Sequence, residues 1–115
     1  MKIERLSPGA HYSRVVVHGD VVYLAGTTAR DASQDVKGQT RQVLDTIDAL
    51  LASAGTDKSK LLTANVWLRD IGDWSKMNEV WDVWIVPGNA PTRATVEAKL
   101  AEPGLLVEIM VTAAK

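Results

Sequence analysis

The chain has no cysteine and no phenylalanine among its 115 residues. Without cysteine it forms neither a disulfide framework nor a thiolate nucleophile. Its two histidines, His11 and His18, lack the spacing of metal ligands, and no HExxH pattern supports zinc. The sequence therefore predicts no metal site and no thiol chemistry.

An excess of charge of one sign is also lacking, because 13 basic residues face 14 acidic ones. No basic run supplies the electrostatic footprint of a nucleic-acid-binding protein. No stretch approaches the roughly 20 apolar residues of a membrane span, and residues 1–5 lack the apolar core of a signal peptide. We therefore expect a soluble, cytoplasmic protein that binds neither nucleic acid nor membranes, with residues 1–115 forming one domain.

A hairpin and an amphipathic helix are predicted in the first half of the chain. Residues 15–17 and 21–25 are β-rich runs, and His18-Gly19-Asp20 between them is typical of a hairpin turn. From Val36 to Ala54, apolar residues recur at three- and four-residue steps, which predicts a helix that Gly55 ends in a left-handed conformation. The candidate N-caps of this helix are Asp31, Ser33 and Asp35.

The second half predicts a strand, a helix and two closing strands. Residues 61–69 alternate as a strand does, and Asp73 is expected to cap a helix that runs to Pro87-Gly88. Two strands near 93–100 and 105–113 follow, joined by a turn at Glu102-Pro103-Gly104. The order is β-β-α-β-α-β-β, an α+β fold with both helices on one face of the sheet.

Strand alternation gives the face on which each side chain is expected to lie. Arg93 shares a face of its strand with Thr95, and Glu108 lies opposite the aliphatic residues of the last strand. If the aliphatic sets lie under the helices, Arg93 and Glu108 both point to the helix-free face. That face would be apolar as well as charged, so we expect another copy of the protein to cover it. Its other expected members are Tyr23, Leu61, Trp67 and Met110.

A fixed cation beside a proton-handling group is suited to work on a small carboxylate. Arginine binds a carboxylate through two hydrogen bonds without titrating, and a nearby carboxyl group can move protons. Two structural alternatives remain open at this stage. Arg93 could form an ion pair with Glu97 or Glu108, and Glu108 could serve only to pair with an arginine.

Several segments, in order along the chain, resemble the RidA/YjgF family of reactive-intermediate deaminases. No single segment is specific, but their order and spacing together are. The tryptophan-rich second helix and the Pro-Thr-Arg spelling are closer to a YoaB-like branch of that family. The segments that carry the resemblance are Pro8–Ser13, Val22–Gly26, Gln39-Thr40, Met77-Asn78, Pro91–Glu97 and Val107–Ile109.

The resemblance implies a chorismate-mutase-like fold that assembles as a homotrimer with ligand clefts between subunits. It also implies the hydrolysis of enamine and imine acids, such as 2-aminoacrylate, to 2-oxo acids and ammonia, without a cofactor. Arg93 would hold the substrate carboxylate, and Glu108 would act on the attacking water as the catalytic residue. The other substrate-binding residues that it implies are Tyr12, Gly26, Thr27 and Thr95.

Two alternatives to a deaminase follow from the same residues. The cleft could bind a 2-oxo acid without turnover, as a sensor or regulatory module would. Ribonuclease activity, reported for parts of the family, fits poorly with a net charge of -1 and no basic groove.

Overall fold

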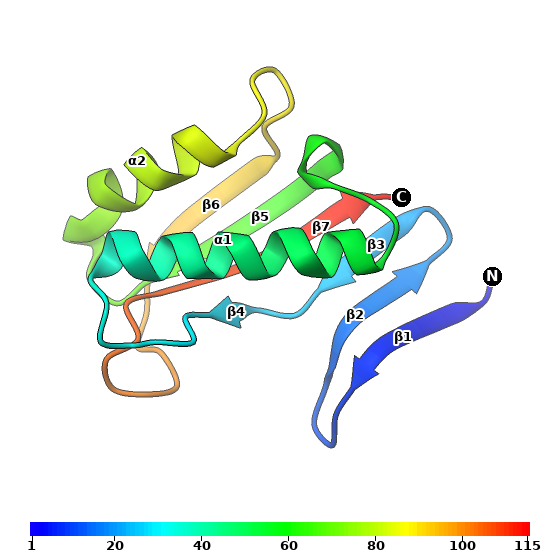
Figure 1. The fold of residues 1–115 in the computed structure, drawn as a ribbon, viewed down its shortest axis with the longest axis horizontal. Coiled ribbons are helices and arrows are strands. Elements are labelled where there is room, and N and C mark those ends of the chain that lie inside the picture. The colour runs from blue at the N-terminus through cyan, green and yellow to red at the C-terminus, as the bar shows by residue number, and fades with distance from the viewer.

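Both helices lie against one face of a single mixed sheet, and the other face carries no helix (Figure 1). The structure is a computed structural model that describes residues 1–115. Hydrogen-bonded neighbours in the sheet follow the order β1-β2-β3-β7-β5-β6, and β4 also pairs with β7. The strands are β1 (Ile3–Pro8), β2 (Ser13–His18), β3 (Val21–Leu24), β4 (Thr27–Thr28), β5 (Leu61–Leu68), β6 (Thr92–Glu97) and β7 (Val107–Ala114). The helices are α1 (Val36–Ser53) and α2 (Trp74–Trp84), with short 3₁₀ turns at Lys58–Lys60 and Ile71–Asp73.

The predicted α+β class and the two helices on one face are confirmed, but two strands were missed. β1 pairs only with β2 at the edge of the sheet, and almost all of its side chains are exposed. An edge strand of this kind has no buried face to impose an apolar alternation on its sequence. β4 is only two residues long, which is too short for a periodic pattern.

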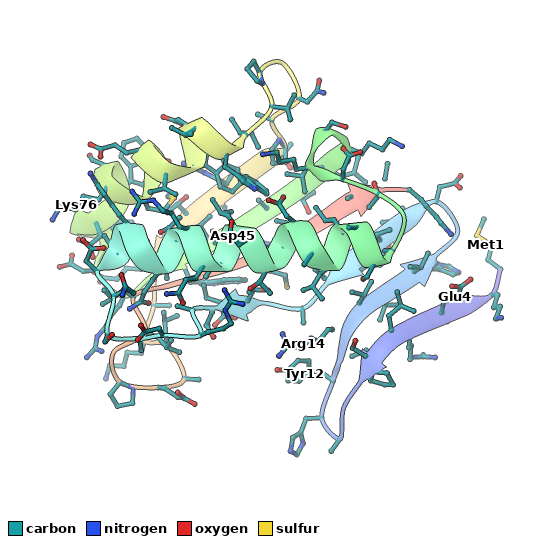
Figure 2. All side chains as sticks on the ribbon, in the orientation of Figure 1. Met1, Glu4, Tyr12, Arg14, Asp45 and Lys76 are labelled. Carbon is teal, nitrogen blue, oxygen red and sulfur yellow. The ribbon has the colours of Figure 1, made fainter.

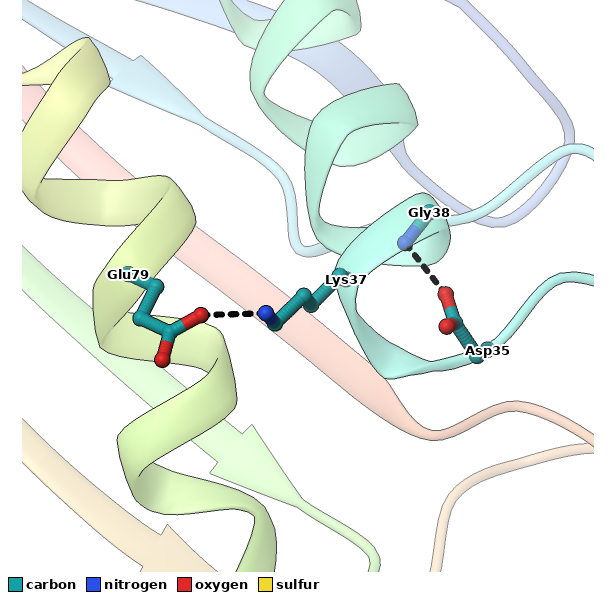
Figure 3. A network of polar contacts seen from close by, with 4 residues as sticks. All are labelled: Asp35, Lys37, Gly38 and Glu79. Carbon is teal, nitrogen blue, oxygen red and sulfur yellow. Dashed lines mark hydrogen bonds and ion pairs between the residues drawn. The ribbon is translucent and has the colours of Figure 1, made fainter.

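Helix α1 begins and ends as its sequence predicts. Of the three candidate N-caps, Asp35 takes the role, because its side chain accepts a hydrogen bond from the Gly38 N–H at 2.8 Å (Figure 3). Gly55 follows the helix with a φ of 78°, in the left-handed region that glycine occupies without strain. An ion pair between Lys37 and Glu79 joins α1 to α2 (Figure 3).

The core lies between one face of the sheet and the two helices. Val107, Ile109, Val111 and Ala113 are all buried, so every second side chain of β7 faces the helices as predicted. From α1, Val43, Leu44, Ile47 and Leu51 pack into the same core. No helix of the fold has the length and apolar character needed to span a membrane.

Strand β5 lies between β6 and β7, and the connection from β6 to β7 therefore passes over it. β5 runs parallel to β6 and antiparallel to β7. The prediction that Leu61 lies on the helix-free face is wrong, because the pairing with β7 shifts register between Leu61 and Thr63. Leu61 is consequently buried in the core, and Leu62 is exposed.

Candidate functional site

Glu108 lies on the helix-free face of the central strand, as predicted. It is the neighbour of Trp67 on β5 and of Thr28 on β4, while Val107 and Ile109 on either side of it are buried in the core. Tyr23 and Met110 lie on this face too, since their chain neighbours are the buried ones. The strand thus presents one carboxylate on an otherwise largely uncharged surface.

Gly26 lies directly against the carboxylate of Glu108. A Cβ atom at position 26 would overlap Oε2 of Glu108 and come within 3.1 Å of its Cδ. The backbone between β3 and β4 can approach the carboxylate this closely only because residue 26 has no side chain. Gly26 and Glu108, which were each predicted as site residues, therefore lie side by side in a single subunit.

A pocket of about 510 Å³ surrounds this pair of residues. Tyr12, the residue before β2, lines it with its side chain 61% exposed. Thr28, which the sequence analysis did not single out, lines it from β4. The other lining residues are Ala25, Gly26, Ala29, Ala101, Glu102, Leu105 and Glu108.

Thr27 contributes to this region only through its backbone. It pairs with the buried Ile109, and its own side chain is 4% exposed. Its hydroxyl donates a long hydrogen bond of 3.5 Å to the Ala25 carbonyl. The side chain is therefore directed into the core, away from Glu108.

A second cleft of about 460 Å³ adjoins the pocket and shares Tyr12, Gly26 and Thr28 with it. Arg14 and Asp45 line this cleft from β2 and α1 (Figure 2). Neither forms an ion pair, since the ion pair between Lys37 and Glu79 is the only one in the chain. The cleft that adjoins the Glu108 pocket thus carries charged groups of both signs.

The prediction that Arg93 shares the helix-free face with Glu108 is wrong. Arg93 is the neighbour of the buried Ala64 on β5, and side chains of paired residues point to the same side of a sheet. Its guanidinium carbon lies 5.0 Å from the centroid of the Trp81 ring on α2. Arg93 therefore lies on the helix-covered face, as do Thr95 and Glu97.

Arg93 is a cation without a carboxylate partner. Glu97, a candidate partner, instead accepts a hydrogen bond from the Ile71 N–H at 3.1 Å. Burial lowers the pKa of the Arg93 guanidinium, and the negative charge of Asp82 acts in the opposite direction. The guanidinium nevertheless remains charged at physiological pH, because its pKa starts from a very high value. Neither structural ion pair considered for Arg93 is present.

Two further polar atoms on the Arg93 side of the sheet have no partner. They are the hydroxyl of Thr95 and the side-chain oxygen of Asn78, and both are buried. Asn78 precedes Trp81 by one turn of α2, and no functional role was predicted for it from the sequence. The sequence does hold a signal for Asn78, because it is a polar residue within the apolar stripe of that helix. Buried polar atoms normally have hydrogen-bond partners, so these two are candidate ligand contacts.

The candidate residues thus form two clusters on opposite faces of the sheet. The first, which we call the Glu108 cluster, contains Glu108, Gly26, Tyr12 and Thr28. The second, the Arg93 cluster, contains Arg93, Thr95 and Asn78. The sheet separates them, so one small molecule cannot touch both clusters of the same subunit.

Another surface depression, of about 990 Å³, lies elsewhere and contains none of these residues. It is bounded by Arg69, Asp70, Asp73 and the connection between β6 and β7. Exposed charges of both signs surround it, and the close contact there between the Gly72 N–H and the Asp70 carboxylate, at 2.8 Å, is accounted for by the N-cap of the 3₁₀ turn Ile71–Asp73. We therefore place the candidate site at the two clusters. No group of three or more His, Asp or Glu side chains is arranged to hold a metal ion.

The family model described as "Endoribonuclease L-PSP" matches residues 2–115. A RutC family protein of Haemophilus ducreyi is 45% identical, over 97% of this chain and 96% of its own. The RutC family protein YoaB of Escherichia coli is 40% identical over 99% of each chain. A solved structure of a YjgF family member from Neisseria meningitidis superposes with a TM-score of 0.97 at 41% identity, covering 100% of this chain and 96% of that one. These matches span the whole fold on which the two clusters lie, and the chain belongs to the YjgF/RidA family.

Proposed function

We propose that this protein hydrolyses enamine and imine acids of the 2-aminoacrylate type to 2-oxo acids and ammonia. The reaction would take place in clefts between the subunits of a homotrimer. The observation that carries the proposal is the position of an unpartnered arginine on one face of the sheet and of the Glu108 pocket on the other. Since the two clusters cannot meet within one subunit, a complete site takes the Arg93 cluster of one copy and the Glu108 cluster of the next.

The helix-free face supports this assembly. Tyr23 and Val96 are exposed on it, and Trp67 is only half-buried beside Glu108. An apolar surface of this kind on a small domain is typical of an interface. A second copy would cover this face and would also add its own residues to the lining of the pocket around Glu108.

Arg93 is suited to bind the substrate carboxylate. Its planar guanidinium offers parallel N–H groups that match the two carboxylate oxygens. A charge-assisted hydrogen bond of this type contributes about 1.5–3 kcal/mol. The Thr95 hydroxyl would add a hydrogen-bond donor for the carboxylate, whereas the unpartnered oxygen of Asn78 would accept from an N–H of the substrate.

Glu108 is suited to the proton transfers of the reaction. Water adds its oxygen to the carbon of the C=N bond, and Glu108 takes one proton from that water and returns it to the nitrogen. The resulting carbinolamine then loses ammonia, and its carbon becomes the carbonyl of the 2-oxo acid. General acid–base help of this type is worth roughly 10²–10⁴-fold.

The proposal is tested by supplying 2-aminoacrylate enzymatically and measuring the release of pyruvate and ammonia. The wild type should accelerate release, while Arg93→Ala and Glu108→Gln should lose most of that acceleration and keep the oligomer. Arg41→Ala, on the exposed side of α1, is the matched control and should behave as the wild type. Release no faster than in buffer alone would refute the proposal.

Two parallel measurements separate the alternatives. Calorimetric binding of 2-oxobutyrate without any turnover would indicate a sensor or regulatory module. Cleavage of RNA would support the activity named in the family description. We expect no RNA cleavage, because a net charge of -1 and mixed charges around the clefts do not provide a basic groove that would bind a phosphate backbone.

A further inference from the structure

The Arg93 guanidinium is held by an aromatic ring and not by a carboxylate. Its Cζ lies 5.0 Å from the centroid of Trp81, within the range of a cation–π interaction. Trp81 is only 5% exposed, so a buried indole ring packs against a half-buried guanidinium. No acidic side chain forms an ion pair with Arg93.

Trp81 is itself fixed by its neighbours on both helices. Its ring centroid lies 5.4 Å from that of Trp84, with an interplanar angle of 52°. The indole N–H of Trp84 donates to both carboxylate oxygens of Asp48 on α1, at 3.0 and 3.1 Å. A continuous series of contacts therefore leads from Asp48 through the two tryptophans to Arg93.

An arginine that packs on an aromatic ring keeps its N–H groups available to a ligand. A carboxylate partner would occupy the N–H groups that a substrate carboxylate needs and would neutralise the charge. An aromatic ring attracts the face of the guanidinium instead and leaves its N–H edge free. The cation is thus oriented before the ligand arrives, and less conformational entropy is lost on binding.

We propose that Trp81 is the positioning residue of Arg93, the platform that holds its guanidinium ready for a carboxylate. The inference rests on the proposed role of Arg93 in binding the substrate carboxylate. Trp84 and Asp48 act one step further away, by fixing the Trp81 ring. Trp81 would act on the ligand only through Arg93 and would have no direct part in the chemical step.

A double-mutant cycle on Trp81 and Arg93 tests the inference, with 2-oxobutyrate as the probe and its Kd measured by calorimetry. Trp81→Leu should weaken binding about 5- to 30-fold, and Trp81→Phe, which keeps a smaller ring, about 2- to 5-fold. In the Arg93→Ala background, Trp81→Leu should produce no further loss, because the platform has nothing left to hold. In turnover assays KM should rise by the same factors while kcat changes less than about twofold.

Two control variants separate positioning from general damage. Trp74→Leu removes an exposed tryptophan from the same helix and should leave the Kd unchanged. Trp84→Phe removes the hydrogen bonds to Asp48 and lowers stability, yet should weaken binding less than Trp81→Leu does. If Trp81→Leu fails to fold, Trp81→Phe and the Arg93 Nε–H chemical shift decide the question. That shift should carry a ring-current displacement that moves in Trp81→Phe.

The outcomes also distinguish this inference from the proposed function. A wild type that neither binds 2-oxobutyrate nor shows turnover would overturn both. A wild type that binds, with Trp81 variants of unchanged Kd or with equal losses in both Arg93 backgrounds, would overturn the positioning role alone.

Discussion

Gly26 has no side chain, and this allows the backbone after β3 to lie against the Glu108 carboxylate. Its φ does not lie in the left-handed region, so alanine can adopt the same backbone. The added Cβ would nevertheless displace the carboxylate. We expect Gly26→Ala to fold with little change in Tm and to lose about 10- to 100-fold in kcat/KM, since a small misplacement of a reacting group is costly. Wild-type rates with 2-aminoacrylate would contradict the role of this close approach.

The sequence predicted which residues share a face of the strand with Arg93, but it did not predict correctly whether the helices cover that face. Arg93, Thr95 and Glu97 do share a face, as strand alternation requires. The face was misassigned because β6 is an edge strand with exposed residues on both sides, so hydrophobicity does not decide its orientation. Pairing with Ala64 of β5 decides it, and that long-range register leaves no local signal in the sequence.

At the scale of elements, the buried side chain of Gln39 joins the segment before α1 to the one before β7. Its Nε2 donates to the carbonyls of Ala32, Gln34 and Gly104 at 3.3, 3.0 and 2.9 Å, and its Oε1 accepts from the Leu106 N–H at 2.9 Å. Gln39→Ala would leave these backbone groups without partners, and we expect a loss of about 2–4 kcal/mol in the free energy of unfolding.

Urea unfolding at pH 7 measures that loss. Gln42→Ala is the matched control on the same helix, because its Oε1 accepts a single surface hydrogen bond from the Asp31 N–H. We expect it to cost less than about 1 kcal/mol. Equal costs for the two variants would show that Gln39 does not join the two segments.

The 3₁₀ turn before β5 gives a prediction about pH. Asp57 caps this turn, and its carboxylate accepts hydrogen bonds from the hydroxyl and the N–H of Ser59. These bonds lower the pKa of Asp57 in the folded state. Its contribution to stability is therefore full above the unfolded-state value of about 3.9 and is lost as the pH falls through the lower folded-state pKa.

Asp57→Ala should accordingly destabilise the protein at pH 7 and have less effect near pH 2. The comparison requires urea midpoints of the wild type and the variant at both pH values. A difference that stays constant or grows on acidification would contradict the lowered pKa.

At the scale of the whole molecule, composition and periodicity were sufficient to predict the fold class, both helices, the β2–β3 hairpin and the buried face of β7. They were insufficient for β1, which buries almost nothing, and for the bulge that turns Leu61 inward. The candidate site was predicted as one cluster, whereas the subunit carries two. Side chains on the two faces of a sheet can form one site only through a second copy, and a single sequence contains no direct signal for that contact.

The division of the site between subunits is the central claim, and coexpression of two inactive variants tests it. Arg93→Ala and Glu108→Gln subunits should assemble into particles of about three times the 12.5 kDa chain mass. Each mixed trimer then regains one intact site, where the Arg93 of one subunit meets the Glu108 of the next. With equal expression and random assembly, about a quarter of the wild-type turnover of 2-aminoacrylate should return. No recovery in mixed trimers, from a wild type that is active, would show that the two residues do not form a site between subunits.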